Sequence, residues 1–223
     1  IADAVPMNSS NHNTGRKGLQ IIKKNMGFWA FLKAHTSAKY ENIHWDTIDF
    51  YYGSLFNADN RITGSTDRAM EILLSYDRNE LETCKNAIQD LNKKDKTRKY
   101  MSMRNNSLAD KIIEEEDQTK APFILIWNKK FSEGLNGLTA AYITDKYKVP
   151  SAVLSPDQKD PEIYKGSAKS MEGCDLVNLF TSHRDMIQSE GDAKAAGLSI
   201  KTKDLETVRQ LLCRDMAGFV PPD

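Results

Sequence analysis

The chain has 223 residues, enough for one large domain or two small ones, and its 31 basic residues balance its 31 acidic ones. This balance excludes a field over the whole protein that would attract nucleic acid, so any anion site must be local. No apolar run approaches the roughly 18 residues that cross a bilayer, and the three cysteines lack metal-ligand spacing, which favours reduced thiols. We therefore expect a soluble, cytoplasmic protein with no membrane partner.

The first quarter of the chain predicts mainly helix. Residues 1–7 have the pattern of a buried strand that ends at a proline, and a natural terminus rarely begins inside such an element. We therefore expect the chain to be the C-terminal part of a longer protein. Residues 8–14 predict a polar loop, and residues 15–34 predict a helix in which Gly27 is a candidate break. Residues 43–52 favour a short helix that enters an irregular segment.

The next stretch combines a predicted loop with a long polar helix. Residues 53–62 predict a loop because of their glycine and Asn/Asp content, and Ser65 or Thr66 can cap a helix that follows. From Glu80 onward, sparse apolar positions among many charges predict a helix that acts as a solvated spacer between two lobes. Residues 93–104 of this helix are basic, but we favour a solvated face there over a dedicated nucleic-acid role.

The pattern changes after Pro122. The continuous apolar run at residues 123–127 predicts a strand covered on both faces, residues 134–147 a helix, and residues 149–154 a second strand. Together they form a βαβ unit. Residues 163–168 predict a third strand that leads into a turn with lysines. Further predictions are a helix at residues 175–182, a strand at 198–200 and a helix at 204–216.

Two glycine-containing segments, residues 165–170 (KGSAKS) and 191–197 (GDAKAAG), carry the functional hypothesis. Each presents lysine beside minimal side chains, which suits a backbone that approaches a phosphate chain closely. The alternative is that the small residues only let a helix pack tightly on a sheet.

The order of these motifs resembles the second half of the DHH-family phosphoesterases and, within that family, the RecJ-type single-stranded DNA exonucleases. Residues 1–7 resemble the last metal-site motif of the family, and residues 50–74 resemble a RecJ segment through Gly53, Asn57, Ala58, Arg61 and Ile62. Residues 134–137 resemble the turn that opens the associated DHHA1 domain. The two glycine-containing segments resemble the later motifs of that domain.

The sequence also departs from the family pattern. The catalytic lobe and its Asp-His-His triplet are absent, since His12, His35, His44 and His183 are isolated. Leu55 and Lys169 stand where the family has arginine, and Asp192 stands where it has histidine. A lysine keeps the charge but not the bidentate fork of arginine, and a carboxylate at position 192 would repel phosphate.

The resemblance implies an α/β fold in which a helical connecting region with a long spacer helix precedes a DHHA1-like domain with a mixed β-sheet flanked by helices. The implied domains are the tail of the DHH domain at 1–14, the connector at 15–120 and the DHHA1-like domain at 121–223. Asp3 would ligate Mn²⁺ or Mg²⁺, which the missing lobe would mainly bind.

The candidate nucleic-acid or phosphate-binding residues come from the same motifs. Arg61 could clamp a phosphate or form a packing salt bridge, and Asn57 could touch the backbone or only shape a turn. Asn136 and Gly137 begin a helix, where free amides attract anions. The remaining candidates would line the wall of the site opposite Asn136 and Gly137. They are Lys165, Ser167, Lys169, Gly191 and Lys194. For the tryptophans at 29, 45 and 127, we favour a core role over base stacking.

The implied function is a part of a metal-dependent 5′–3′ single-stranded DNA exonuclease of the RecJ type, acting in DNA repair and recombination. This portion would bind and guide the strand and would not cleave by itself. Its partners would be single-stranded DNA and single-strand-binding, replication or repair proteins. The alternatives are a DHH-family phosphodiesterase for short oligonucleotides or nucleotides, and a non-catalytic strand-binding or replication-scaffold protein.

Overall fold

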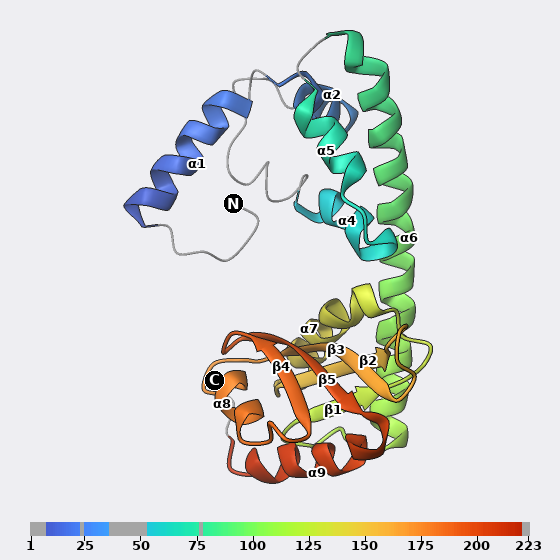
Figure 1. The fold of residues 1–223 in the computed structure, drawn as a ribbon, viewed down its shortest axis with the longest axis vertical. Helices are drawn as coiled ribbons and strands as arrows, with labels where there is room; N and C mark the ends of the chain where they lie inside the picture. The colour runs from blue at the N-terminus through green and yellow to red at the C-terminus, as the bar shows by residue number, and fades with distance from the viewer. Residues whose placement is uncertain (1–7, 23–24, 36–52, 76–77, 220–223) are drawn as a thin grey trace. The chain divides into compact units, whose positions relative to one another are not determined.

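The computed structural model describes residues 8–22, 25–35, 53–75 and 78–219 (Figure 1). The chain divides into two compact units, residues 1–99 and residues 100–223. The predicted strand end at residues 1–7 and the predicted short helix within residues 43–52 lie outside the described residues. In the described part, no helix is both long and apolar enough to cross a membrane.

The described part of the first unit is helical. It contains α1 (Ser9–Ile22), α2 (Met26–His35), α4 (Ser54–Thr63), α5 (Asp67–Leu74) and, after a short 3-10 turn (Arg78–Glu80), the beginning of α6 (Leu81–Glu115). The buried apolar side chains of this unit come from α2, α4, α5 and α6. Those that form its hydrophobic core cluster are Phe28, Phe31, Leu55, Ile72, Ala87, Ile88 and Leu91.

The prediction of a loop at residues 8–14 is wrong, because α1 begins at Ser9. The side chain of Asn8 accepts a hydrogen bond from the backbone N–H of Asn11 at 2.9 Å, as residues that precede helices often do. The predicted long helix at residues 15–34 is two helices. Asn25 precedes the second helix and caps it, since its Oδ1 accepts a hydrogen bond from Phe28 N at 2.7 Å. Gly27 lies inside α2, where a Cβ would come 2.0 Å from Ile72 O.

The prediction of a loop at residues 53–62 is also wrong, because nearly all of these residues lie in α4. Leu55, Ala58 and Asp59 are the buried side of this helix, and Gly64 ends it with a φ of 74°. The burial of the Asp59 carboxylate is compensated by Lys94 of α6 and by Thr63, each of which donates a hydrogen bond to it at 2.7 Å. A polar residue on the buried side hid the helical period from sequence analysis.

The predicted long spacer is confirmed as α6, a single helix of 35 residues. Its buried apolar residues fall into two groups. The first group is Ala87, Ile88 and Leu91 in the core of the first unit. The second group, Ala109, Ile112 and Ile113, belongs to a core of the second unit. The stretch between the groups is mostly polar, as the sequence predicted.

The second unit is built on a mixed five-stranded sheet, which confirms the predicted fold class. Its strands lie in the order β1 (Ile124–Trp127), β2 (Ser151–Pro156), β3 (Ile163–Lys169), β5 (Ala195–Lys201), β4 (Ile187–Gly191). The β1 and β2 strands are parallel, and the other pairs are antiparallel. The crossover helix α7 (Asn136–Tyr147), which follows a 3-10 turn (Glu133–Leu135), completes the predicted βαβ unit.

Helices cover both faces of this sheet. On one face, α8 (Leu176–Thr181) and α9 (Leu205–Asp215) pack on a core that includes Leu125, Leu154 and Leu198. On the other face, α6 and α7 pack on Ile124, Ile126 and Val153. The apolar run at residues 123–127 is therefore covered on both sides, as predicted.

The outer edge of β1 is closed by a side chain. The amide of Gln118 donates from Nε2 to Leu125 O at 3.2 Å and accepts at Oε1 from Leu125 N at 3.3 Å. Gln118 thus pairs with both backbone polar groups of one strand residue, as a neighbouring strand would.

Two details of the strands differ from the sequence predictions. The lysine turn expected at residues 165–170 is largely strand, since β3 continues to Lys169. The strand expected at residues 198–200 begins earlier, at Ala195, and β4 was not predicted. Four of the five residues of β4 are exposed, so it shows no apolar run.

Candidate nucleic-acid interface

The two glycine-containing segments lie side by side in the sheet. Ser167 of β3 faces Gly197 of β5, Gly166 faces Leu198, and Lys169 faces Ala195. Beyond Lys169, Ser170 N donates to Lys194 O at 2.9 Å, which extends the contact into the turn between β4 and β5. Two segments that are well separated in the sequence therefore form one continuous surface.

The strand register shows which side chains share a face. Because neighbours in register point the same way, Lys165, Ser167 and Lys169 lie on the α7 side of the sheet with Gly197 and Ser199. Helix α7 packs against β2 and β3 on this side. Next to it lies a surface groove of about 540 Å³. Its lining includes Glu133, Lys165, Ser167, Glu190, Gly197 and Ser199.

The beginning of α7 is tied to the sheet beside this groove. Asn136 is fully buried, and its Nδ2 donates to Ser155 Oγ at 3.0 Å and to Lys165 O at 3.3 Å. Its Oδ1 has no hydrogen-bond partner among the described residues. A Cβ on Gly137 would lie 3.4 Å from Ser167 Oγ, so the helix and β3 are in close contact here. The amide of Asn136 thus ties the start of α7 to β2 and β3 beside the groove.

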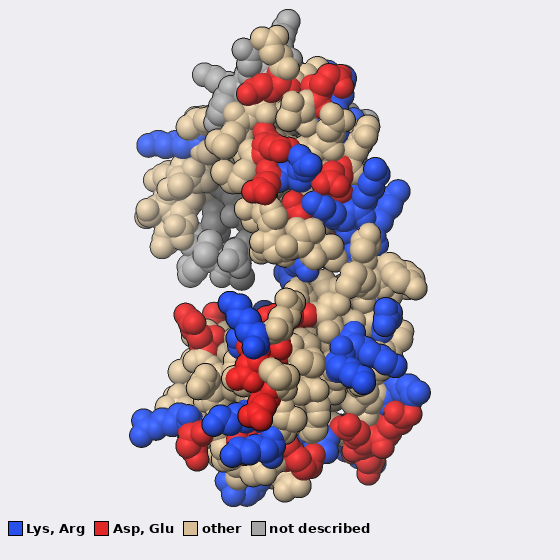
Figure 2. All heavy atoms as spheres, turned by 45° about the vertical axis from the view of Figure 1, so that its right-hand side comes forward, with Lys and Arg blue, Asp and Glu red and all other residues tan. Residues whose placement is uncertain are grey.

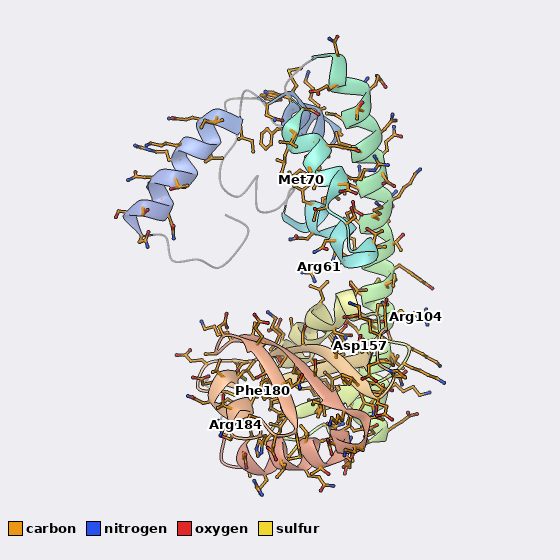
Figure 3. The ribbon with its side chains drawn as sticks, viewed as in Figure 1. Arg61, Met70, Arg104, Asp157, Phe180 and Arg184 are labelled. Atoms are coloured by element: carbon orange, nitrogen blue, oxygen red, sulfur yellow. The ribbon has the colours of Figure 1, made fainter. Side chains whose placement is uncertain are left out.

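The charged residues that line the groove are one lysine and two glutamates, so its net charge is negative. Lys165 forms an ion pair with Asp157, labelled in Figure 3, at 2.6 Å. The hydrogen bond to Asp157 raises the pKa of Lys165. Glu133 and Glu190 also line the groove. The groove therefore offers hydroxyl groups and closely approachable backbone to a strand, but no net positive charge.

Asp192 closes the turn between β4 and β5. Its Oδ1 accepts from Lys194 N at 2.7 Å and from Ala195 N at 2.9 Å, and these two bonds lower the pKa of the carboxyl group. Gly191, at the start of the turn, has a φ of 151°, which side chains rarely allow. Lys194 lines a second hollow of about 670 Å³ beside residues 170–175. Asp192 therefore has a structural role at this position.

Arg61 and Asn57 belong to the first unit, on α4 rather than on the expected loop. Asn57 is exposed. Arg61, labelled in Figure 3, is partly buried, and burial together with the nearby charge of Arg98 lowers its pKa. Within the described residues, Arg61 has no ion pair, so the structure supplies no packing salt bridge for it. Arg98 itself binds Asp95 at 2.7 Å.

The tryptophans in the described part pack against cores. Trp29 packs on the core of the first unit, and Trp127 on a core of the second. The guanidinium of Arg209 lies 5.0 Å from the centroid of the Trp127 ring. Trp45, like the predicted metal ligand Asp3, lies outside the described residues.

No metal centre is formed by the described residues, since no three His, Cys, Asp or Glu side chains gather there. Several residues that line the groove are not among the predicted site residues, for example Glu133, Glu190 and Ser199. Strand register alone could have placed Ser199 beside Lys165, but only if the full extent of β5 had been recognised.

No family model and no curated protein matches the sequence. Solved structures do match. RecJ from Thermus thermophilus in complex with Mn²⁺ has a TM-score of 0.77 and 21% identity, over 100% of this chain and 32% of that one. The Mg²⁺ complex of the same protein gives the same TM-score and identity and is covered to 33%. An exonuclease RecJ bound to manganese has a TM-score of 0.72 and 20% identity, over 100% of this chain and 54% of that one.

These comparisons confirm the resemblance at the level of the fold. The described fold, a helical unit followed by a mixed β-sheet flanked by helices, is shared with the RecJ structures. The chain spans between about a third and about half of the length of these matched chains.

Proposed function

We propose that this chain is the strand-binding portion of a RecJ-like, metal-dependent nuclease that degrades single-stranded DNA from the 5′ end. The fold likeness and the order of the sequence motifs support this proposal. The observation that carries it is the pairing of β3 with β5. This pairing brings two motifs of the resemblance together beside the start of α7 and a groove.

The described residues would bind and orient the strand. Ser167 and Ser199 can donate hydroxyl hydrogen bonds to phosphate oxygens, and Gly197 leaves room for the backbone of the strand. Lys169 and Lys194, at the adjoining turn, would add positive charge. Asn57 and Arg61 would contact the strand from the first unit. Single-strand-binding or repair proteins are proposed as partners of the whole protein.

In the whole protein, Mn²⁺ or Mg²⁺ would supply the activation of water for phosphodiester hydrolysis. Asp3 would be one of its ligands. The matched RecJ structures contain these ions. The residues that would complete such a site are not among those that the structure describes.

A non-catalytic strand-binding protein is the alternative that one observation favours. Asp192 stands where the resemblance implies a histidine, and its carboxylate is used to close a turn. A DHH-family phosphodiesterase for very short substrates would differ from both in its length dependence. Its affinity for oligonucleotides would reach a plateau at a length of two to three nucleotides.

The proposed role of the groove in strand binding is tested by Ser167→Asp, which adds a negative charge where a phosphate would lie. The loss of a hydrogen bond to a charged group costs about 1.5–3 kcal/mol, so we expect affinity for fluorescein-labelled dT₃₀ to fall at least roughly tenfold. Thr181→Asp, at an exposed position of α8, is the matched control. Equal affinities of Ser167→Asp and the unaltered chain for dT₃₀ would contradict the proposed role of the groove.

A further inference from the structure

The exposed side of α6 carries cations that have no partners within the described residues. Lys93, Lys96 and Arg104 project from this helix, and their side chains form no hydrogen bond or ion pair with the described part of the chain. By contrast, Lys85 is paired with Glu82 at 2.5 Å and Lys111 lies 3.5 Å from Glu115. The unpaired cations therefore cluster in the middle of the helix.

This stretch is also free of exposed carboxylates. Between Lys93 and Lys111 the only acidic residues are Asp95 and Asp110. The Asp95 side chain is 8% exposed and bound by Arg98 and Lys99, while Tyr142 and Lys146 bind Asp110. Figure 2, in which the side that α6 occupies in Figure 1 comes forward, shows Lys and Arg side chains along it. A helix that is merely solvated usually mixes both signs of charge on its outer side.

Two large apolar side chains stand among these cations. Tyr100 is 70% exposed and Met103 is 71% exposed. The positions 93, 96, 100, 103 and 104 follow the three- and four-residue spacing that places side chains on one side of a helix. All of them lie on one unbroken helix, so this spacing follows from α6 alone. Arg104 projects outward from α6 in Figure 3.

We propose that this surface of α6, formed by Lys93, Lys96, Tyr100, Met103 and Arg104, binds single-stranded nucleic acid. The cations would contact successive phosphates, and the Tyr100 ring would stack on a base. From residue 93 to residue 104 the helix rises about 17 Å, which is enough for several phosphates. The proposal differs from the solvated-face interpretation of residues 93–104, while the role of α6 as a spacer is unchanged.

The proposal rests on the proposed function only in the identity of the ligand, a single strand. It also supplies what the groove lacks, since the one lysine that lines the groove is outnumbered by two glutamates and is paired with Asp157. The α6 surface would supply the salt-dependent attraction that the groove lacks, because that attraction comes from unpaired cations that displace counterions from phosphates.

The test measures binding of the whole 223-residue chain to fluorescein-labelled dT₃₀ by anisotropy at several salt concentrations. The triple variant Lys93→Gln, Lys96→Gln, Arg104→Gln should bind more weakly. Its plot of log affinity against log salt should be shallower by about 2, because each lost phosphate contact removes about 0.7 from the slope. The matched control is Lys85→Gln with Lys111→Gln, which removes exposed cations that already have acidic neighbours.

Tyr100 is tested separately. Tyr100→Ala should lose about tenfold in affinity for dT₃₀, while Tyr100→Phe, which keeps the ring, should bind like the unaltered chain. Circular dichroism should show unchanged helix content in every variant. If the triple variant keeps the affinity and salt slope of the unaltered chain, the proposal is overturned. It is also overturned if the triple variant loses binding to polyglutamate but not to dT₃₀, since the partner would then be an acidic protein.

The outcome is distinguishable from failure of the groove. If Ser167→Asp binds dT₃₀ normally and the triple variant does not, the groove proposal fails and the α6 proposal stands. A duplex that competes as well as dT₃₀ would overturn the single-strand preference, because paired bases are not available to Tyr100.

Discussion

Gly166 and Gly197 show how differently two residues of the same motif pair are used. A Cβ on Gly166 would lie 1.9 Å from Val153 O, a distance that no side chain tolerates, whereas a Cβ on Gly197 would lie 3.7 Å from Glu190 O. Gly166 therefore allows β3 to approach β2, and Gly197 keeps the floor of the groove open. Gly166 is therefore a small residue that allows tight packing. Gly197 suits the other interpretation, in which a small residue lets a phosphate chain come close.

We expect Gly166→Ala to lower the free energy of unfolding by about 3 kcal/mol or more, because the backbone of β2 must move. Gly197→Ala should change that energy by less than about 1 kcal/mol, since its Cβ makes only ordinary contacts. Urea unfolding followed by circular dichroism measures both. Similar losses in the two variants would refute the distinction.

Asn136 and its partners illustrate what residue types alone can predict. Sequence analysis placed Asn136 correctly at the start of a helix, but the direction of its amide depends on Ser155 and on the carbonyl of Lys165. These partners are 19 and 29 residues away in the chain. Pairings over such separations follow from the sheet register, which the sequence does not reveal.

At the scale of elements, the polar contacts between α6 and α7 converge on one carboxylate, beside the apolar core that the two helices share. Asp110 accepts hydrogen bonds from Tyr142 at 2.8 Å and from Tyr147 at 3.2 Å, and forms an ion pair with Lys146 at 2.8 Å. Burial would raise the pKa of Asp110, but the bonds from Lys146 and Tyr142 hold that pKa below its usual value. One residue of the spacer helix is thus bound by three side chains of the crossover helix.

We expect Asp110→Asn to lower the free energy of unfolding by about 2 kcal/mol at pH 7. A carboxyl group whose pKa is lower in the folded state stabilises the protein above its unfolded pKa of about 3.9, and this contribution is lost as the pH falls through the folded value. The difference between variant and unaltered chain should therefore shrink below about pH 4. Urea unfolding at pH 7 and pH 3 measures this difference. Tyr142→Phe, which removes one hydrogen bond to Asp110, should lower the free energy of unfolding by less than Asp110→Asn does.

Elements with a clear period were predictable, and those supported by polar contacts were not. The apolar runs at residues 123–127 and 149–154 predicted β1 and β2. The widely spaced apolar residues of α6 predicted a long helix. Helix α4 was not predicted because its buried side includes Asp59, whose carboxylate is stabilised there by Thr63 and by Lys94, 35 residues away. Strand β4 was missed because Ile187 is its single buried residue.

At the scale of the whole molecule, the resemblance implies that the catalytic lobe is not in this chain. We therefore expect residues 1–223 to release no nucleotides from 5′-labelled dT₃₀ in the presence of Mn²⁺. Denaturing electrophoresis over several hours measures this, with a RecJ enzyme as the positive control. Robust digestion by the purified chain, abolished by a chelating agent, would show that the metal site lies within these residues.

The two outer strands of the sheet bear on how copies of the chain behave at high concentration. An exposed strand edge invites another chain to add a strand, which is a route to fibrils. At β1, the Gln118 amide already occupies the backbone N–H and C=O of Leu125, so an added strand could not pair with that residue. At the opposite end, β4 is five residues long, is polar after Ile187 and carries the charge of Glu190. The sheet is thus protected against lateral growth at both ends.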